Sequence, residues 1–228
     1  MFFIGPKMKF NRVVSDQIAE LIETLKPDYI VLDCDGTLYP NIMEARSAFY
    51  ESLYGYFLRK FGYTKELTDL CLLKNKSKYD TVSEIAACLQ SGINEVEFNK
   101  EVIEPMNLRN LGIQEPSPWQ ILAGYKIPVI IFTNNSSFFA SLIAKKVGIS
   151  NCVIQIFGES ELAFIRKPAS EAFKHIANAI PKDTRVLYFD DDAICLETGQ
   201  LFGWKSIQTF YGVTHQDGLH KYKRLFIN

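Results

Sequence analysis

The order of apolar runs and helical stretches is the feature that most constrains the fold of this chain. Short apolar runs, each typical of a buried strand, recur along the sequence, and segments with helical spacing of apolar residues separate them. Strands that alternate with helices favour a doubly wound parallel sheet, because the crossover helices cover both of its faces. We therefore predict an α/β fold. Its expected strands are residues 29–32, 127–132, 153–157, 185–189 and 206–210.

A long helical stretch interrupts this alternation between the first two expected strands. From about Met43 to Leu111 the apolar residues follow helical spacing, and no run there indicates a strand. We predict that residues 1–40 and 112–228 form an α/β core and that residues 41–111 form a small inserted helical domain.

The first expected strand leads directly into the run DCDGTLYP, Asp33–Pro40. Asp33 and Asp35 are two residues apart, so an extended backbone would point both carboxylates the same way. Two like charges that close are unfavourable unless a cation lies between them. The run therefore predicts a metal site and a carboxylate nucleophile, although an aspartate after a strand is, taken alone, more often a helix cap.

Polar residues also follow two other expected strands. Thr133 and Asn134 come after residues 127–132, and the triplet 190–192 of aspartates comes after residues 185–189. Lys167 stands just before a helix predicted to start at Pro168. In a parallel sheet all these strand ends lie at one edge, so residues far apart in sequence can converge there. Their coincidence favours one shared site over separate capping or surface roles.

Composition excludes several classes of protein. The chain has 228 residues, 47% of them hydrophobic, and a formal net charge of −1, which gives no electrostatic case for nucleic-acid binding. The five cysteines are odd in number and form no CxxC pair, which argues against a disulfide framework and favours a reducing cytosol. The apolar N-terminal start is too short for a signal peptide, and no stretch approaches a membrane span. We expect a cytoplasmic protein without nucleic-acid or membrane partners.

In these motifs the chain resembles the haloacid dehalogenase-like (HAD) hydrolase superfamily. The family pattern DxDGT is matched by DCDGT, the threonine-ended strand by IIFTNN, the lysine motif by Lys167-Pro168, and the acidic motif by LYFDDD. The helical stretch lies where the family inserts its C1 caps. Within the superfamily, DCDGTLYP and ETGQLFG look most similar to the pyrimidine 5′-nucleotidase branch.

The resemblance implies roles for the two acids of the first motif. Asp33 would attack phosphorus and form an aspartyl-phosphate, and Asp35 would protonate the leaving oxygen and then activate water. An acid at the second position favours phosphoryl transfer over dehalogenation, because an alkoxide leaving group needs a proton. The residues expected to contact the phosphate are Gly36, Thr133, Asn134 and Lys167.

The resemblance also implies a Mg²⁺ cofactor. Its expected ligands are the Asp33 carboxylate, the Asp35 backbone carbonyl and the Asp191 carboxylate. Asp190 would support them, while Asp192 would cap the following helix. Many relatives carry Asp or Asn where this chain has Cys195.

We expect a Mg²⁺-dependent phosphomonoester hydrolase acting on a small phosphorylated metabolite, with a nucleoside 5′-monophosphate as the leading candidate. Three alternatives stay open. One is a phosphomutase on a sugar phosphate, another a phosphate-binding regulatory module that has lost turnover, and the third a phosphoprotein phosphatase. Cys195 favours the second, and the inserted helical domain argues against the third. Tyr39, in the hinge that leads to this domain, is a candidate substrate contact. The sequence does not indicate an oligomeric state.

Overall fold

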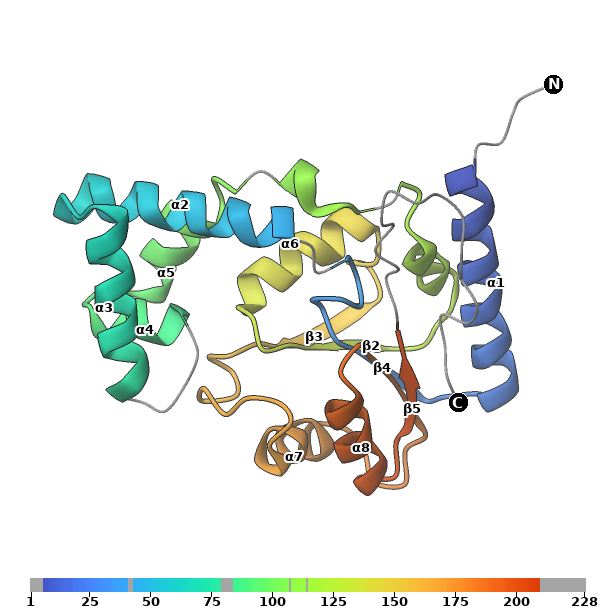
Figure 1. Cartoon of the computed structure of the whole chain (residues 1–228). Coiled ribbons are helices and arrows are strands. Elements are labelled where there is room, and N and C mark those ends of the chain that lie inside the picture. The colour runs from blue at the N-terminus through green and yellow to red at the C-terminus, as the bar shows by residue number, and fades with distance from the viewer. Residues whose placement is uncertain (1–5, 41–42, 79–83, 107, 114, 210–228) are drawn as a thin grey trace. The chain divides into compact units, whose positions relative to one another are not determined.

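The computed structural model of the chain describes residues 6–40, 43–78, 84–106, 108–113 and 115–209. The chain divides into two compact units, one made of Met1–Asn41 and Ile113–Asn228, the other of Ile42–Gly112. Each is described by itself below. The first unit contains the strands of the chain and the second contains helices (Figure 1).

Within the described residues the α/β unit holds a five-stranded parallel sheet in the order β3-β2-β1-β4-β5. This order confirms the predicted doubly wound α/β fold, and it places β1 in the centre of the sheet. Phe210, which we expected to end the last strand, lies outside the described residues. The strands are β1 (Tyr29–Leu32), β2 (Val129–Phe132), β3 (Val153–Phe157), β4 (Val186–Asp190) and β5 (Lys205–Gln208).

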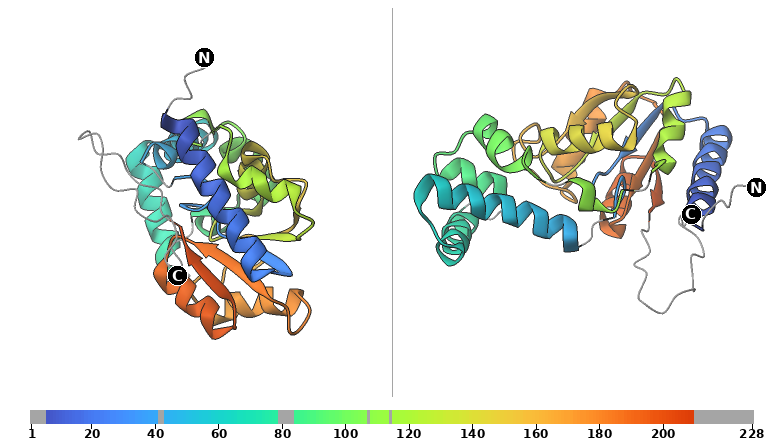
Figure 2. Two further views of the ribbon diagram at one scale, coloured as in Figure 1. Left: turned by 90° about the vertical axis from the view of Figure 1, so that its right-hand side faces the viewer. Right: turned by 90° about the horizontal axis from the view of Figure 1, so that it is seen from above.

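Helices cover both faces of this sheet, which explains the continuous apolar sequences of its central strands. One face packs against α7 (Ser170–Ala179) and α8 (Ala193–Leu201). The ring centroids of Phe132 on β2 and Phe173 on α7 lie 5.0 Å apart there. Figure 1 shows α6 (Ser137–Val147) on the opposite side of the sheet from α7 and α8. The 3₁₀ helix η3 (Pro118–Gly124) and α1 (Pro6–Leu25) complete the unit (Figure 2).

Several predicted elements differ from the structure at their ends or in their type. The strands expected at 127–132, 185–189 and 206–210 are found at Val129–Phe132, Val186–Asp190 and Lys205–Gln208. The helix expected from Trp119 is a 3₁₀ helix that begins at Pro118, capped by the Ser117 side chain. Helix α7 begins at Ser170, because a turn closed by the Ala169 N–H and the Arg166 carbonyl precedes it. Helix α1 starts at Pro6, well before its clear apolar periodicity.

The described residues of the unit Ile42–Gly112 form helices joined by turns and contain no strand, as predicted. Its core is apolar and aromatic, with Leu53, Phe57, Phe98 and Val102 fully buried. Across the described residues of the whole chain, no helix has both the length and the apolar composition that a membrane crossing requires. The helices of this unit are α2 (Met43–Phe61), α3 (Lys65–Lys78), α4 (Glu84–Gln90), α5 (Glu95–Phe98), a π-helix (Asn99–Ile103) and the 3₁₀ helix η2 (Leu108–Leu111).

Candidate active site

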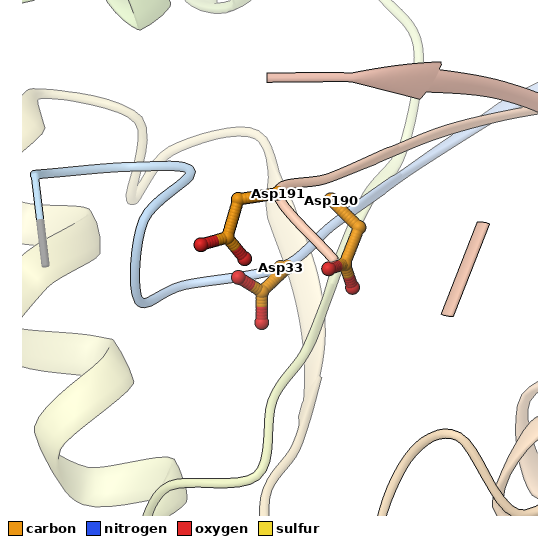
Figure 3. A group of neighbouring side chains, drawn as sticks. All are labelled: Asp33, Asp190 and Asp191. Carbon is orange, nitrogen blue, oxygen red and sulfur yellow. The ribbon is translucent and has the colours of Figure 1, made fainter. Parts of the chain in front are cut away.

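The carboxyl ends of β1 and β4 bring three aspartates together. The register of this strand pair sets Leu32 beside Phe189, and the Asp33 N–H donates to the Phe189 carbonyl at 2.9 Å. One carboxylate oxygen from each of Asp33, Asp190 and Asp191 lies within 4.8 Å of the other two. Figure 3 shows these three side chains grouped at the strand ends. The sheet edge therefore gathers acids that are more than a hundred residues apart in sequence.

Lys167 places a positive charge inside this acidic group. Its ammonium lies 2.7 Å from Asp33 Oδ1 and 2.6 Å from Asp190 Oδ2, and only 6% of the residue is exposed. A buried charge is costly unless it is paired, and here both partners are buried as well. The structure thus excludes the alternative that Lys167 is an ordinary surface lysine.

The backbone of Lys167 is fixed by the loop that follows β2. The Lys167 N–H donates to Asn134 Oδ1 at 2.8 Å, and Asn134 Nδ2 donates to the Lys167 carbonyl at 3.1 Å. These two hydrogen bonds hold the loop before α7 against the end of β2. Asn134 was expected to contact phosphate through its backbone N–H, and its side chain has this additional role.

Burial and pairing act in opposite directions on the charges of Asp33 and Lys167. Burial raises the pKa of Asp33 well above its ordinary value, although the neighbouring Lys167 ammonium opposes the shift. Burial alone would lower the pKa of Lys167, but Asp190 and Asp33 raise it well above its ordinary value. The two acids therefore favour the charged form of Lys167, and Asp33 needs positive charge nearby to stay ionised.

The two acids after β4 are held differently. Asp190 pairs with Lys167 and also accepts hydrogen bonds from the Tyr188 hydroxyl and from the Asp192 N–H. Asp191 keeps a large exposed surface, while its carboxyl group lies against Gly36. Burial of that group, followed by the charge of Asp190, raises the pKa of Asp191 to about 6. Asp191 thus resembles a carboxylate kept open for a ligand, and Asp190 resembles a support.

Gly36 is required by this close approach. A Cβ atom at this position would lie 2.1 Å from Asp191 Oδ2, and the backbone has a φ of +85°, which glycine adopts readily. The Gly36 N–H also donates to the Tyr39 carbonyl at 2.9 Å, which closes the turn. The glycine of the DCDGT run therefore allows the turn to approach the acid of the other strand.

The site fits a hard divalent cation. Asp33 Oδ2 is buried and has no hydrogen-bond partner among the described residues. An unpaired buried carboxylate oxygen costs free energy, so its place beside a second open carboxylate, Asp191, favours the binding of a cation between them. Carboxylate and carbonyl oxygens are the ligands that Mg²⁺ prefers.

Asp35 is surrounded by hydrogen-bond donors. Thr133 Oγ1 donates to Asp35 Oδ2 at 3.4 Å, Asn135 Nδ2 lies 3.3 Å and 3.4 Å from its two oxygens, and the Tyr39 hydroxyl donates to Oδ1. Tyr39 is only 3% exposed and its hydroxyl is used in this bond to Asp35, whereas its contact with a substrate stays a prediction. Burial, followed by the charge of Asp35, raises the pKa of Tyr39 well above its ordinary value, which keeps its hydroxyl a donor.

Two residues that donate hydrogen bonds to the acids of the site were not predicted from the sequence: Asn135, which contacts Asp35, and Tyr188, which contacts Asp190. Asn135 follows two residues that were singled out, but its own contact with Asp35 depends on the path of the loop. Tyr188 could have been found, because it lies two residues before Asp190 and an extended strand points both to the same face.

Capping residues account for other polar groups near the site. The Ser136 side chain accepts from the Phe139 N–H at the start of α6, and Asp192 caps α8 by accepting from the Ile194 N–H, as predicted. Thr133 Oγ1 instead accepts from the Asn135 N–H at 3.1 Å, within the loop. Cys195 is buried, and this burial raises its thiol pKa, so the thiol stays neutral beside the acids.

No protein-family model matches the sequence, and a search of curated proteins returns no match. Among solved structures, the chain is similar to a candidate phosphatase from Clostridium difficile, with 18% identity, a TM-score of 0.49, and coverage of 84% of this chain and 88% of that one.

Two further solved structures are similar over comparable lengths. One is a HAD-superfamily hydrolase of subfamily IA from Geobacter sulfurreducens, with 12% identity, a TM-score of 0.46, and coverage of 79% of this chain and 88% of that one. The other is a candidate HAD hydrolase, YfnB from Bacillus subtilis, bound to magnesium, with 16% identity, a TM-score of 0.39, and coverage of 79% and 86%. Identities and TM-scores this low carry no conclusion about the function of this chain.

Proposed function

We propose that this protein is a Mg²⁺-dependent phosphomonoester hydrolase of the HAD-like superfamily that acts through an aspartyl-phosphate. The observation that carries the proposal is the state of Asp33. Its carboxylate is buried, Oδ1 lies against the Lys167 ammonium, and Oδ2 has no partner among the described residues. Asp35, a second acid on the same run, lies close by with several hydrogen-bond donors around it. A nucleophile and a proton carrier are thus present together.

The reaction has two displacements at phosphorus. An Asp33 oxygen forms a bond to phosphorus while the ester P–O bond breaks, and Asp35 gives its proton to the departing alkoxide. Water then attacks the phosphorus of the acyl phosphate. Asp35 takes the proton of that water, the bond from phosphorus to Asp33 breaks, and inorganic phosphate leaves.

Positive charge and donors around the phosphate stabilise both transition states. The Thr133 hydroxyl, the Asn134 N–H and the Lys167 ammonium are proposed to hold its oxygens, with Gly36 leaving room for them. Mg²⁺ held by the Asp33 and Asp191 carboxylates and the Asp35 carbonyl, with Asp190 in support, would neutralise charge between nucleophile and phosphate. Lys167 also reduces the repulsion that this acidic group exerts on a dianionic substrate.

Phosphate release from a panel of monoesters with Mg²⁺ tests the proposal. We expect turnover by the wild-type protein, none by Asp33→Asn, and none after chelation of the metal. Asp183→Asn is the matched control, because Asp183 is an exposed residue outside the site, with a φ of 59° that asparagine tolerates. A panel that the wild-type protein binds but never hydrolyses would contradict the proposal and favour a regulatory phosphate-binding module.

As the substrate class we propose nucleoside 5′-monophosphates, on the similarity of DCDGTLYP and ETGQLFG to the pyrimidine 5′-nucleotidase branch. We further propose that the unit Ile42–Gly112 acts as a C1 cap and selects the leaving group. The panel therefore includes nucleotides, sugar phosphates and small phosphorylated acids. Preference for a sugar phosphate would contradict the nucleotide assignment. Isomerised sugar phosphate with little free phosphate would replace hydrolysis by a mutase reaction.

A further inference from the structure

We propose that Tyr39 is a positioning residue that holds Asp35 for proton transfer to poor leaving groups. This inference rests on the proposed phosphatase function and deepens it. Tyr39 lies in the same turn as Asp35, and its hydroxyl donates a hydrogen bond to Asp35 Oδ1. Its role is therefore exerted through Asp35 and not by contact with substrate.

The backbone places Tyr39 opposite Asp35. Asp35 and Tyr39 form an isolated β-bridge, and the Gly36 N–H donates to the Tyr39 carbonyl at 2.9 Å. The Leu38 N–H and the Thr37 N–H both donate to the Cys34 carbonyl, at 2.9 Å and 3.4 Å, so three backbone hydrogen bonds close the turn. The position of the Tyr39 Cα relative to Asp35 is thus set by the chain itself.

The ring of Tyr39 is held from the other side. It is nearly fully buried and meets the ring of Phe139 on α6 edge-on, with centroids 6.1 Å apart and planes at 72°. A ring fixed at both ends places its hydroxyl with little freedom. Locked neighbours of this kind are what hold a catalytic group within productive geometry.

The other side chains that donate to Asp35 do so over longer distances than a typical hydrogen bond. Thr133 Oγ1 and Asn135 Nδ2 lie 3.3 Å to 3.4 Å from the carboxylate oxygens, near the long limit of a hydrogen bond. Without Tyr39, Asp35 would be restrained by these long contacts alone among the described side chains. We expect the Asp35 carboxyl group to rotate away from the leaving oxygen. Proton transfer would then slow, because it requires close contact between the two oxygens.

The leaving group distinguishes this role from a structural one. An alkyl ester needs a proton at its departing oxygen, whereas p-nitrophenyl phosphate leaves as a stable anion without one. We expect Tyr39→Phe to lower kcat/KM about ten-fold for uridine 5′-monophosphate, or for ribose 5-phosphate if the nucleotide is not hydrolysed. For p-nitrophenyl phosphate the change should stay below about two-fold.

Two further variants complete the test. In an Asp35→Asn background the same Tyr39→Phe substitution should have no additional effect, because the residue acts only through Asp35. Tyr125→Phe is the matched control, since the Tyr125 hydroxyl bonds Glu23 away from the site, and its kinetics should equal the wild type. An equal loss on both esters, an additive loss in the double variant, or a faster Tyr39→Phe protein would overturn the proposal.

A measurement without turnover separates this proposal from the proposed function. In metal-free protein labelled with ¹³C at the tyrosine Cζ atoms, the Tyr39 resonance, assigned from its absence in Tyr39→Phe, should shift in Asp35→Asn. An unchanged resonance would contradict the contact itself. A shifted resonance in a protein that hydrolyses no ester would instead contradict the phosphatase function, and with it the use of the contact in catalysis.

Discussion

The backbone of Gly36 and the carboxylate of Asp191 lie in direct contact, although Gly36 follows β1 and Asp191 follows β4. A Cβ atom on Gly36 would come within 2.1 Å of Asp191 Oδ2 and 2.5 Å of its Cγ. The two segments can therefore meet only because residue 36 has no side chain. This contact links the first acidic motif to the last one.

Gly36→Ala should disturb the metal site more than the fold. The added methyl group displaces the Asp191 carboxylate, and the positive φ adds a backbone cost of about 1–2 kcal/mol. We expect Mg²⁺ affinity, measured by isothermal titration, to fall by at least ten-fold. Gly203→Ala is the control, because Gly203 has a similar φ of +78° but no described atom within 4 Å of such a Cβ. Equal Mg²⁺ affinities in the two variants would contradict the role of the contact.

Lys167→Met should destabilise the metal-free protein strongly. The substitution leaves Asp33 and Asp190 buried without their shared cation, and breaking a buried pair in this way costs about 3–5 kcal/mol. Urea unfolding at pH 7.5 measures this loss, which should shrink at pH 5 as carboxylates take up protons. Lys146→Met, which removes an exposed pair with Glu115, should change little. A stability of Lys167→Met equal to the wild type at pH 7.5 is the contrary result.

Asp191→Asn should stabilise the metal-free protein at pH 7.5. The pKa of Asp191 is raised from 3.8 to about 6, so its contribution to stability is full below pH 3.8 and is lost as the pH rises through 6. A neutral amide removes that loss, and thermal unfolding should show a higher midpoint than the wild type. The difference should shrink as the pH falls from 6 to 3.8 and nearly vanish at pH 3.

The same substitution should abolish the stabilisation of the protein by Mg²⁺, because the open carboxylate is gone. In the wild type the Mg²⁺-induced rise in Tm should fade below pH 6, where Asp191 binds a proton. If Asp191→Asn keeps the Mg²⁺ response unchanged, Asp190 and not Asp191 contacts the metal directly.

Asn134→Ala should reduce turnover without removing any group that we assign to chemistry. Its side chain makes two hydrogen bonds to the backbone of Lys167, and without them the lysine loop can shift. Loss of such supporting contacts typically costs about 10–100-fold in activity. Steady-state kcat/KM on the best ester measures the effect. Asn178→Ala, on the exposed side of α7, is the control and should behave as wild type.

The sequence predicts the convergence of Asp33, Lys167 and Asp190 because strand ends in a parallel sheet share one edge. It also predicts that Asp192 caps α8, because a position directly before a helix is a local property of the sequence. It does not predict that Tyr39 faces Asp35, since this depends on the closure of a turn. Nor does it predict that Asn134 binds the backbone of Lys167, because that contact joins two loops whose paths no periodicity describes.

The central position of β1 has a consequence for the order of folding. The Asp33–Lys167 pair spans 134 residues, and the Thr37 hydroxyl bonds that of Thr209 across 172 residues. Such non-local contacts form late, because long loops must close first. During synthesis Asp33, the proposed nucleophile, leaves the ribosome long before Lys167, Asp190 or β5. A partly made chain therefore carries the acidic run without Lys167 and Asp190, and the proposed activity requires the C-terminal half of the sheet to have folded.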